Sequence, residues 1–282
     1  MSFLASRELT APAVGIVGVP YDATSSFRPG SRRGPAAIRW ASQSIETYSP
    51  ILDRDLEAVA VTDFGDLPVE DAAPEAAVDT VRAWVSELPQ QTLPMIFGGE
   101  HTITLGAVQA LHARHPDLAV LQFDAHTDLR DDYDGRHLSH ATVMRRVLET
   151  VGNGSIVQLG IRAGSREEFA LAHDAARHSA PRMALPTTVW TWLEERPLYV
   201  TLDIDVIDPA AAPGTGNPEP EGVSVTEILA VIRRLGYLRV VGFDLVEVSP
   251  PLDPTGQTAV LAAVLAREAI LSFQLAHRPH PA

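Results

Sequence analysis

The sequence of 282 residues contains no cysteine and no lysine, so all 22 of its basic residues are arginine. The lack of cysteine excludes disulfides, a cysteine nucleophile and cysteine-ligated zinc. The lack of lysine excludes Schiff-base catalysis and the phosphate-binding lysine of a P-loop. Several common catalytic classes are therefore removed by composition alone.

Long apolar runs are also missing, because no stretch approaches the roughly 18 residues that span a bilayer. The first ten residues lack the basic start and long apolar core of a signal peptide, so we expect a cytoplasmic protein. The formal net charge of −14 argues against nucleic acid or an anionic membrane as a partner. It favours cations near the surface, whether metal ions or a positively charged substrate.

Apolar, β-prone runs alternate with helical patterns along the chain. The runs that predict strands are 13–19, 58–63, 93–97, 118–123, 155–160, 198–203 and 239–244. The segments that predict helices are 35–41, 75–87, 104–114, 141–149, 166–178, 225–235 and 258–274. Continuous apolar strands that alternate with helices are typical of a parallel sheet covered on both faces. With no domain break or repeat evident, we expect one α/β domain over residues 1–282, built as three α/β/α layers around a mostly parallel sheet.

Carboxylates and histidines are concentrated in three short segments, each of which follows a predicted strand. The segments are G-G-E-H-T (98–102), F-D-A-H-T-D (123–128) and L-D-I-D-V-I-D (202–208). Side chains alternate along an extended chain, and ligands bind at the carboxyl ends of parallel strands, so all three segments can meet in one crevice. The six potential metal ligands are His101, Asp124, His126, Asp128, Asp203 and Asp205.

A structural role is the alternative for each segment taken alone. A carboxylate at the end of a buried strand can pair with an arginine, and Arg130 is near in sequence. Three such segments, each at a strand end, favour metal binding instead. The carboxylates exceed what a single zinc site normally uses, and they suit two divalent ions.

Several motifs, in the same order along the chain, resemble those of the ureohydrolases, the family of arginases and agmatinases. Besides the three segments above, they are G-V-P-Y-D (18–22), R-R-G-P-A-A-I-R (32–39), S-H-A-T (139–142) and G-F-D-L-V-E-V-S-P (242–250). The stretches 129–146 and 213–222 are most similar to those of bacterial agmatinases.

The resemblance implies two manganese ions per chain, bridged by a hydroxide. On the family's pattern, one ion would be held beside Asp124 by His101, Asp128 and Asp205. The other would be held by His126, with Asp203 and Asp205 reaching one ion or both. Ligand type alone leaves Zn²⁺, Co²⁺ and Ni²⁺ as alternatives to Mn²⁺.

The resemblance also assigns three catalytic residues for the release of urea and an amine from a guanidino compound. Asp128 would accept a proton from the attacking water. His140, in S-H-A-T, would contact the substrate and protonate the leaving amine, with a surface histidine as the alternative and His137 as the nearby competitor. Glu247 would bind the guanidinium, although a salt bridge to an arginine is the alternative for this carboxylate.

Agmatine is the expected substrate. Where arginases carry aspartates that help bind the α-amino group of arginine, this chain has Ala-Gly-Ser at 163–165. Asp131 and Asp132 are candidate contacts for the distal amine of agmatine, with a solvated acidic loop as the alternative. Arg130 and Arg136 leave open a substrate with a distal carboxylate, such as guanidinobutyrate.

Two other functional classes are alternatives. A non-catalytic relative that binds metal as a regulator or subunit predicts lost ligands or a lost Glu247 or His140 counterpart, and none is lost here. A deacetylase on the same architecture would normally use a single zinc with fewer carboxylates, so the full set disfavours it, whereas a formimino hydrolase stays open. Family members are usually trimers or hexamers, so the expected partners are a small cationic guanidino substrate and further copies of this chain.

Overall fold

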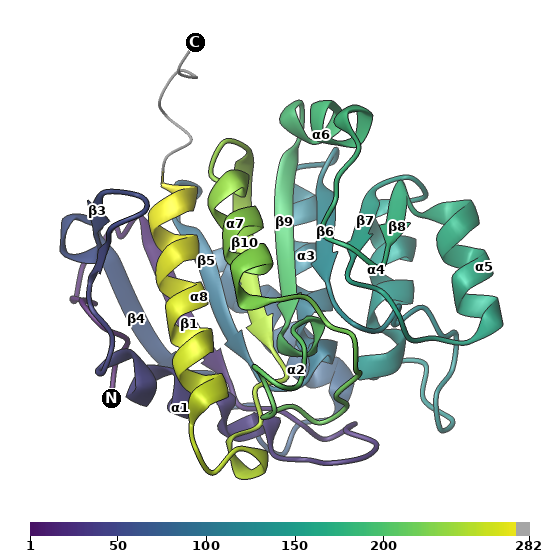
Figure 1. The fold of residues 1–282 in the computed structure, drawn as a ribbon, viewed down its shortest axis with the longest axis horizontal. Coiled ribbons are helices and arrows are strands. Elements are labelled where there is room, and N and C mark those ends of the chain that lie inside the picture. Colours follow the sequence, from purple (N-terminus) through teal and green to yellow (C-terminus); the bar gives the residue numbers. More distant parts are fainter. Residues whose placement is uncertain (275–282) are drawn as a thin grey trace.

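An eight-stranded parallel sheet forms the centre of the computed structural model, which describes residues 1–274 (Figure 1). The strands follow one another across the sheet in the order β4-β1-β5-β10-β9-β6-β7-β8. Their bounds are β1 (Val14–Val19), β4 (Val61–Asp66), β5 (Leu93–Gly98), β6 (Ala119–Phe123), β7 (Ile156–Leu159), β8 (His178–Ala180), β9 (Pro197–Asp203) and β10 (Arg239–Val246). A separate antiparallel pair joins β2 (Tyr48–Ser49) to β3 (Arg54–Asp55). The expected parallel α/β sheet is confirmed.

Helices cover both faces of the sheet and close two hydrophobic cores against it (Figure 1). On one face lie α1 (Gly34–Ser42), α6 (Thr187–Glu194), α7 (Val225–Leu235) and α8 (Gln257–Phe273). On the other face lie α2 (Pro74–Glu87), α3 (Thr104–Arg114), α4 (Val143–Val151) and α5 (Arg166–Ala175). Central strands buried from both sides explain why their sequences read as continuous apolar runs. Within residues 1–274, no helix is both long enough and apolar enough to cross a membrane.

Parallel strands bring their carboxyl ends to one edge of the sheet, and this places the three polar segments together. The neighbours in register are Gly98 and Val19, Phe123 and Leu202, and Val246 and Asp203. Single turns of 3₁₀-helix follow β5 and β9 and carry site residues: η3 (His101–Ile103) and η5 (Ile204–Val206). A third turn, η4 (His140–Thr142), leads into α4.

The predicted helix 166–178 is too long at its carboxyl end. Helix α5 ends at Ala175, where the chain turns extended, and the Arg177 amide donates to the Ile156 carbonyl at 2.7 Å. The chain therefore leaves the helix after Ala175, and His178–Ala180 form β8 beside β7. This pairing is non-local, and the helical pattern gave no sign of it.

Helix α6 and the small β2–β3 pair were not predicted. Helix α6 begins after Pro186 and consists largely of threonine, valine and tryptophan, which favour strands. Its Val189 and Leu193 pack into the core, so tertiary burial overrides local propensity. The predicted strand 58–63 also begins late, at Val61, because residues 56–58 form a 3₁₀ turn capped by Asp55.

Candidate metal centre and active site

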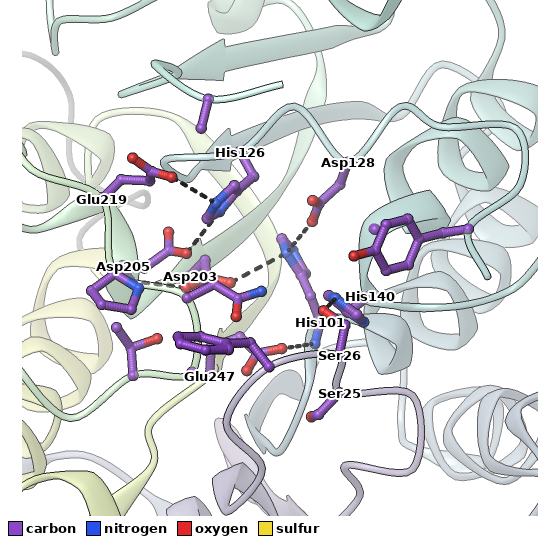
Figure 2. Close-up of a pocket in the computed structure, with 18 of the residues that line it drawn as sticks. Ser25, Ser26, His101, His126, Asp128, His140, Asp203, Asp205, Glu219 and Glu247 are labelled. Carbon is purple, nitrogen blue, oxygen red and sulfur yellow. Dashed lines mark hydrogen bonds and ion pairs between the residues drawn. The ribbon is translucent and has the colours of Figure 1, made fainter. Parts of the chain in front are cut away.

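A cavity of about 500 Å³ opens at the carboxyl edge of the sheet. Seven of the sequence-predicted site residues line it: His101, His126, Asp128, His140, Asp203, Asp205 and Glu247 (Figure 2). Asp124 is fully buried beside them and contacts both metal-candidate histidines. The structure thus brings all six potential ligands, together with His140 and Glu247, to one place.

His101 points its Nδ1 atom at carboxylates from two neighbouring strands. Nδ1 lies 3.0 Å from Asp128 Oδ2, 3.1 Å from Asp124 Oδ2 and 3.6 Å from Asp203 Oδ2. The ring is 1% exposed, and among residues 1–274 this nitrogen has no hydrogen bond of acceptable geometry. A buried nitrogen without such a bond, surrounded by carboxylate oxygens, fits a bound cation.

His126 forms a second, adjoining group. Its Nδ1 lies 2.9 Å from Asp205 Oδ2 (Figure 2). The same nitrogen lies 3.6 Å from Asp124 Oδ1. Potential ligand atoms converge in two sets, His101 with Asp124 and Asp203, and His126 with Asp124 and Asp205. Because Asp124 belongs to both sets, the geometry suits two adjacent ions that share it.

The structure divides the ligands differently from the division expected from the sequence at Asp205. Asp205 lies beside His126, not beside His101, whereas Asp203 faces His101. The reason is local: one Asp203 oxygen caps the Asp205 amide at 2.8 Å, so only its other oxygen faces His101. Asp205 in turn accepts from the Ala125 amide at 3.0 Å, which holds it toward His126.

Two site residues have left-handed backbones that favour glycine. The φ angles are 52° at Asp128 and 63° at Glu247. Such conformations cost of order 1–3 kcal/mol and persist where surrounding structure imposes them. At Glu247 the amide donates to Gly99 O at 2.7 Å, and Oε1 accepts from the His101 amide at 2.9 Å. Glu247 is thus tied to the same turn that carries His101.

Gly99 allows this turn to pack against the end of β1. A Cβ atom at this position would lie 1.9 Å from the Tyr21 carbonyl oxygen. The adjacent Glu100 amide donates to that same oxygen at 2.7 Å. The close approach brings the segment after Tyr21, including Thr24 and Ser26, alongside the cavity.

The density of negative charge shifts the pKa of nearly every group in the cluster. Burial, and then the neighbouring Asp124, raise the pKa of Asp128 to about 7. Burial, and then Asp205, raise the pKa of Asp203 well above its usual value. Burial opposes protonation of His126, but Asp205 and Asp124 outweigh it and raise its pKa to about 12. So many buried carboxylates repel one another unless a cation lies between them.

His140 has a different environment from the two metal-candidate histidines. Its Nδ1 lies 3.3 Å from Thr24 Oγ1, and its Nε2 lies 3.2 Å from Ser26 Oγ. Thr24 Oγ1 is also 2.5 Å from Glu100 Oε1, and since an ionised carboxylate only accepts, the hydroxyl proton points to Glu100. Thr24 then accepts from His140 Nδ1–H, which leaves Nε2 free for a proton. Burial, and then the positive charges of His126 and His101, lower the pKa of His140 to about 4.

Glu100 is not one of the six predicted ligands, and sequence reasoning missed its partner Thr24. Glu100 is fully buried and accepts from the Thr24 amide at 2.7 Å and from both the Thr24 and Thr102 hydroxyls at 2.5 Å. The motif that ends at Asp22 precedes Thr24 by two residues, so the signal lay just outside the matched letters.

Glu168 and Glu219 also line the cavity and were not predicted. Glu168 is 5% exposed and accepts from the Thr127 hydroxyl at 2.7 Å and the Ser165 amide at 2.7 Å. A capping-box pattern of Ser165 followed by Glu168 could have identified the latter contact. Glu219 lies 3.9 Å from His126 Nε2 (Figure 2), within the stretch 213–222 whose similarity to agmatinases was the available signal.

The structure does not bring Asp131 or Asp132 into the cavity. Neither is among the residues that line it. The Asp131 side chain is 67% exposed and pairs with Arg146 at 2.7 Å, while Asp132 accepts from the Gly135 amide at 2.9 Å. Backbone turns and a surface ion pair occupy these carboxylates, as in the solvated-loop alternative. His137 contacts the Asp131 carbonyl and likewise does not line the cavity.

Comparisons with known proteins agree with this geometry. Residues 12–272 match the model of the "Arginase family". The agmatinase of Bacillus subtilis (strain 168) is 43% identical over 96% of each chain, and the proclavaminate amidinohydrolase of Streptomyces clavuligerus is 34% identical over 94% of this chain and 89% of that protein. The crystal structure of the agmatine ureohydrolase of Thermoplasma volcanium superposes with a TM-score of 0.87 at 37% identity, over 97% of this chain and 94% of that one. The chain belongs to the arginase family, the family of ureohydrolases that its motifs predicted.

Proposed function

We propose that this protein hydrolyses agmatine to putrescine and urea with two manganese ions. The observation that carries the proposal is the pair of adjoining ligand sets that share Asp124, beside the carboxylate of Glu247. The similarity to agmatinases over almost the whole chain supports agmatine among guanidino substrates.

One ion would be held by His101, Asp124, Asp128 and Asp203, and the other by His126, Asp124 and Asp205. Two imidazoles with carboxylates suit Mn²⁺, which prefers such ligands to sulfur. Two adjacent divalent ions supply a water whose pKa is low enough for it to attack the guanidinium carbon at neutral pH.

Glu247 is the residue that would bind the guanidinium. Its Oε1 already accepts from the His101 amide, and the side chain lines the cavity beside the ligands. A carboxylate forms strong, charge-assisted hydrogen bonds with guanidinium N–H groups, and these orient the carbon for attack. Burial, and then the neighbouring Glu100, raise the pKa of Glu247 well above its usual value, so a cationic substrate would complete its environment.

Asp128 and His140 would move the protons. Asp128 lies next to the ligand atoms and would accept the proton that the attacking water releases. The C–N bond to the amine then breaks, and the amine must gain a proton as it leaves. Because the pKa of His140 is lowered to about 4, its Nε2 carries no proton at neutral pH; it would accept the proton that Asp128 took from the water and pass it to the amine, while Ser26 orients that nitrogen.

The remaining charges along the cavity favour a substrate with a cationic distal end. Beyond the ligands and Glu247, the lining includes the carboxylate of Glu219, which has no arginine partner within residues 1–274, and that of Glu168, whose charge is offset by Arg130. The two lining arginines are already engaged: Arg130 pairs with Glu168 at 3.3 Å, and Arg28 donates to the carbonyls of Thr215 and Gly216. A distal amine such as that of agmatine suits this lining better than a carboxylate does.

A urea-release panel tests the proposal. Purified protein reconstituted with Mn²⁺ is given agmatine, arginine and 4-guanidinobutyrate at equal concentrations. We expect agmatine to have the highest kcat/KM by at least about 100-fold, which corresponds to roughly 2.7 kcal/mol. A preference for arginine or guanidinobutyrate would overturn the substrate, and the absence of urea from all three would overturn the reaction.

We also infer that the protein is a cytoplasmic homo-oligomer, a trimer or hexamer. Large apolar side chains are exposed on the single chain, including Trp40 (65%) and Ile51 (68%), and a contact between copies would bury such groups. Light scattering coupled to size exclusion measures the state directly. A mass near three or six chains is expected, and a monomer at micromolar concentration would contradict it.

A further inference from the structure

Asp244, on β10, is a buried carboxylate outside the predicted ligand set. It is 0% exposed, and the structure gives it no salt bridge to an arginine within residues 1–274. It accepts hydrogen bonds from three hydroxyls instead: Tyr199 Oη at 2.5 Å and Thr104 Oγ1 at 2.8 Å on Oδ2, and Thr201 Oγ1 at 2.6 Å on Oδ1. Burying a carboxylate costs free energy. A buried carboxylate that is held by three hydroxyls, with no arginine partner among the described residues, therefore indicates a functional role.

The bonds around Thr201 have a defined direction. An ionised carboxylate only accepts, so the single Thr201 hydroxyl proton points to Asp244. Thr201 Oγ1 also lies 2.9 Å from His101 Nε2, and with its proton committed it can only accept there. In the neutral form of His101, which metal binding requires, Nε2 therefore carries the ring proton.

A neutral histidine protonated on Nε2 presents a bare lone pair on Nδ1. In His101 that nitrogen is the one directed at Asp124, Asp128 and Asp203. Hydrogen bonds beyond a metal ligand commonly fix its tautomer and ring orientation in this way.

We propose that Asp244 and Thr201 are positioning residues that lock His101 in the tautomer able to bind a metal ion, and that they thereby control loading of the ion site formed with Asp124 and Asp203. The inference rests on the dinuclear site of the proposed function. His126 provides an internal contrast, because the one partner that the structure gives its Nε2 within residues 1–274 is Glu219, at 3.9 Å. The chain of hydrogen bonds from Asp244 through Thr201 to His101, here called the relay, thus acts on one ion site and not on the other.

Asp244→Asn reverses the relay with little change in shape. Two hydroxyls donate to the Oδ2 side, so the amide oxygen stays there and the NH₂ group faces Thr201. Thr201 then accepts from Asn and gives its own proton to His101 Nε2. The ring proton moves to Nδ1 and blocks the ligand atom.

The experiment counts manganese per chain in metal-free protein titrated with Mn²⁺, by equilibrium dialysis with elemental analysis. Wild type is expected to bind two ions. Asp244→Asn is expected to hold one as before and to bind the other about 10- to 100-fold more weakly. Thr201→Val, which removes the hydroxyl, should weaken the same ion to a similar extent. Thr201→Ser, which keeps the hydroxyl, should bind both ions as wild type does.

Tyr199→Phe is the matched control, since it removes a buried hydrogen bond to Asp244 and leaves the Thr201 bonds in place. It should bind two ions with wild-type affinity. The proposal is overturned if Asp244→Asn also binds two ions tightly, or if Tyr199→Phe loses an ion equally. If Asp244→Asn does not fold, the Thr201→Val and Thr201→Ser pair decides. Wild type that binds fewer than two ions would contradict the dinuclear function itself, and the relay with it.

Discussion

Glu247 has a strained, left-handed backbone and still carries a long, charged side chain. Glycine would relieve the strain, so a glutamate at such a position indicates that its carboxylate matters more than local stability. The same holds for Asp128 in the cluster of ligands.

Glu247→Gln should lower kcat/KM for agmatine by on the order of 10²- to 10³-fold while leaving two manganese ions bound. The amide keeps the shape but cannot neutralise and orient a guanidinium as a carboxylate does. Steady-state kinetics and metal analysis on the same preparation check both parts. Glu221→Gln is the matched control, because Glu221 has a similar φ of 62° but is exposed and lies outside the cavity. Equal loss in the two variants would refute a specific role for Glu247.

Asp128→Asn should stabilise the metal-free protein, and increasingly so as pH rises from about 4 to 8. Burial raises the pKa of Asp128 from 3.8 to about 7. The folded state therefore holds a proton that the unfolded state has released in this range, and stability is lost as pH rises through the folded pKa. The asparagine side chain does not titrate in this range, so the variant does not lose this part of the free energy of unfolding. Urea unfolding in the presence of a chelator at several pH values measures the difference from wild type.

Asp134→Asn is the control for the unfolding measurements on Asp128→Asn. Asp134 also has a φ of 52°, but it is exposed. Its substitution should shift the unfolding free energy by a similar small amount at every pH. A pH-independent difference for Asp128→Asn as well would contradict the burial of an ionisable Asp128.

At the scale of the elements, Arg162 connects three backbone segments beside the site, at residues 160, 205–206 and 219–220. Its guanidinium donates to five backbone carbonyls, those of Gly160, Asp205, Val206, Glu219 and Pro220, at 2.8 to 3.2 Å. The bonds tie the chain after β7 to the turn after β9 and to the loop that follows it. All the donors of this side chain are used, which is how a planar guanidinium can fix the backbone at a metal ligand.

Arg162→Lys should destabilise the protein by roughly 2–4 kcal/mol, since an ammonium cannot reach five carbonyls and several buried acceptors lose their donors. It should also weaken the manganese ion at Asp205 and His126. Chemical unfolding and metal titration are the measurements. Arg177→Lys, where the arginine makes one such bond to Gly154, should change stability by less than about 0.5 kcal/mol. Similar effects in both variants would show that the five-carbonyl contact is unimportant.

The sequence predicted the elements that carry the six ligands because their signals are local. Each strand is a continuous apolar run, and a polar segment follows it directly. A parallel sheet brings these segments to one edge, so their proximity can be predicted without the remaining tertiary contacts. The contacts of Thr24 with Glu100, Asp244 with Thr201, and Arg162 with its carbonyls join residues far apart in sequence. Helix α6 and strand β8 were missed for a related reason, since burial and long-range pairing decide them.

At the scale of the whole molecule, a net charge of −14 and a buried cluster of carboxylates favour divalent cations. Mn²⁺ at about 100 times its Kd should add about 2.7 kcal/mol of stability per site, because it binds only the folded state. For a chain of this size, two sites would raise the Tm by roughly 10–20 °C. Differential scanning calorimetry with and without Mn²⁺ measures the shift, with Na⁺ at equal ionic strength as the control. No shift would contradict a preformed cation site.

The central claim is that two ions act together beside Glu247 to hydrolyse a guanidinium. The most direct test is the initial rate of urea release from agmatine as Mn²⁺ is added stepwise to metal-free protein at a concentration well above the Kd. The rate should increase until two equivalents per chain are present and then stay constant. A plateau at one equivalent, or no urea at any ratio, would contradict the account.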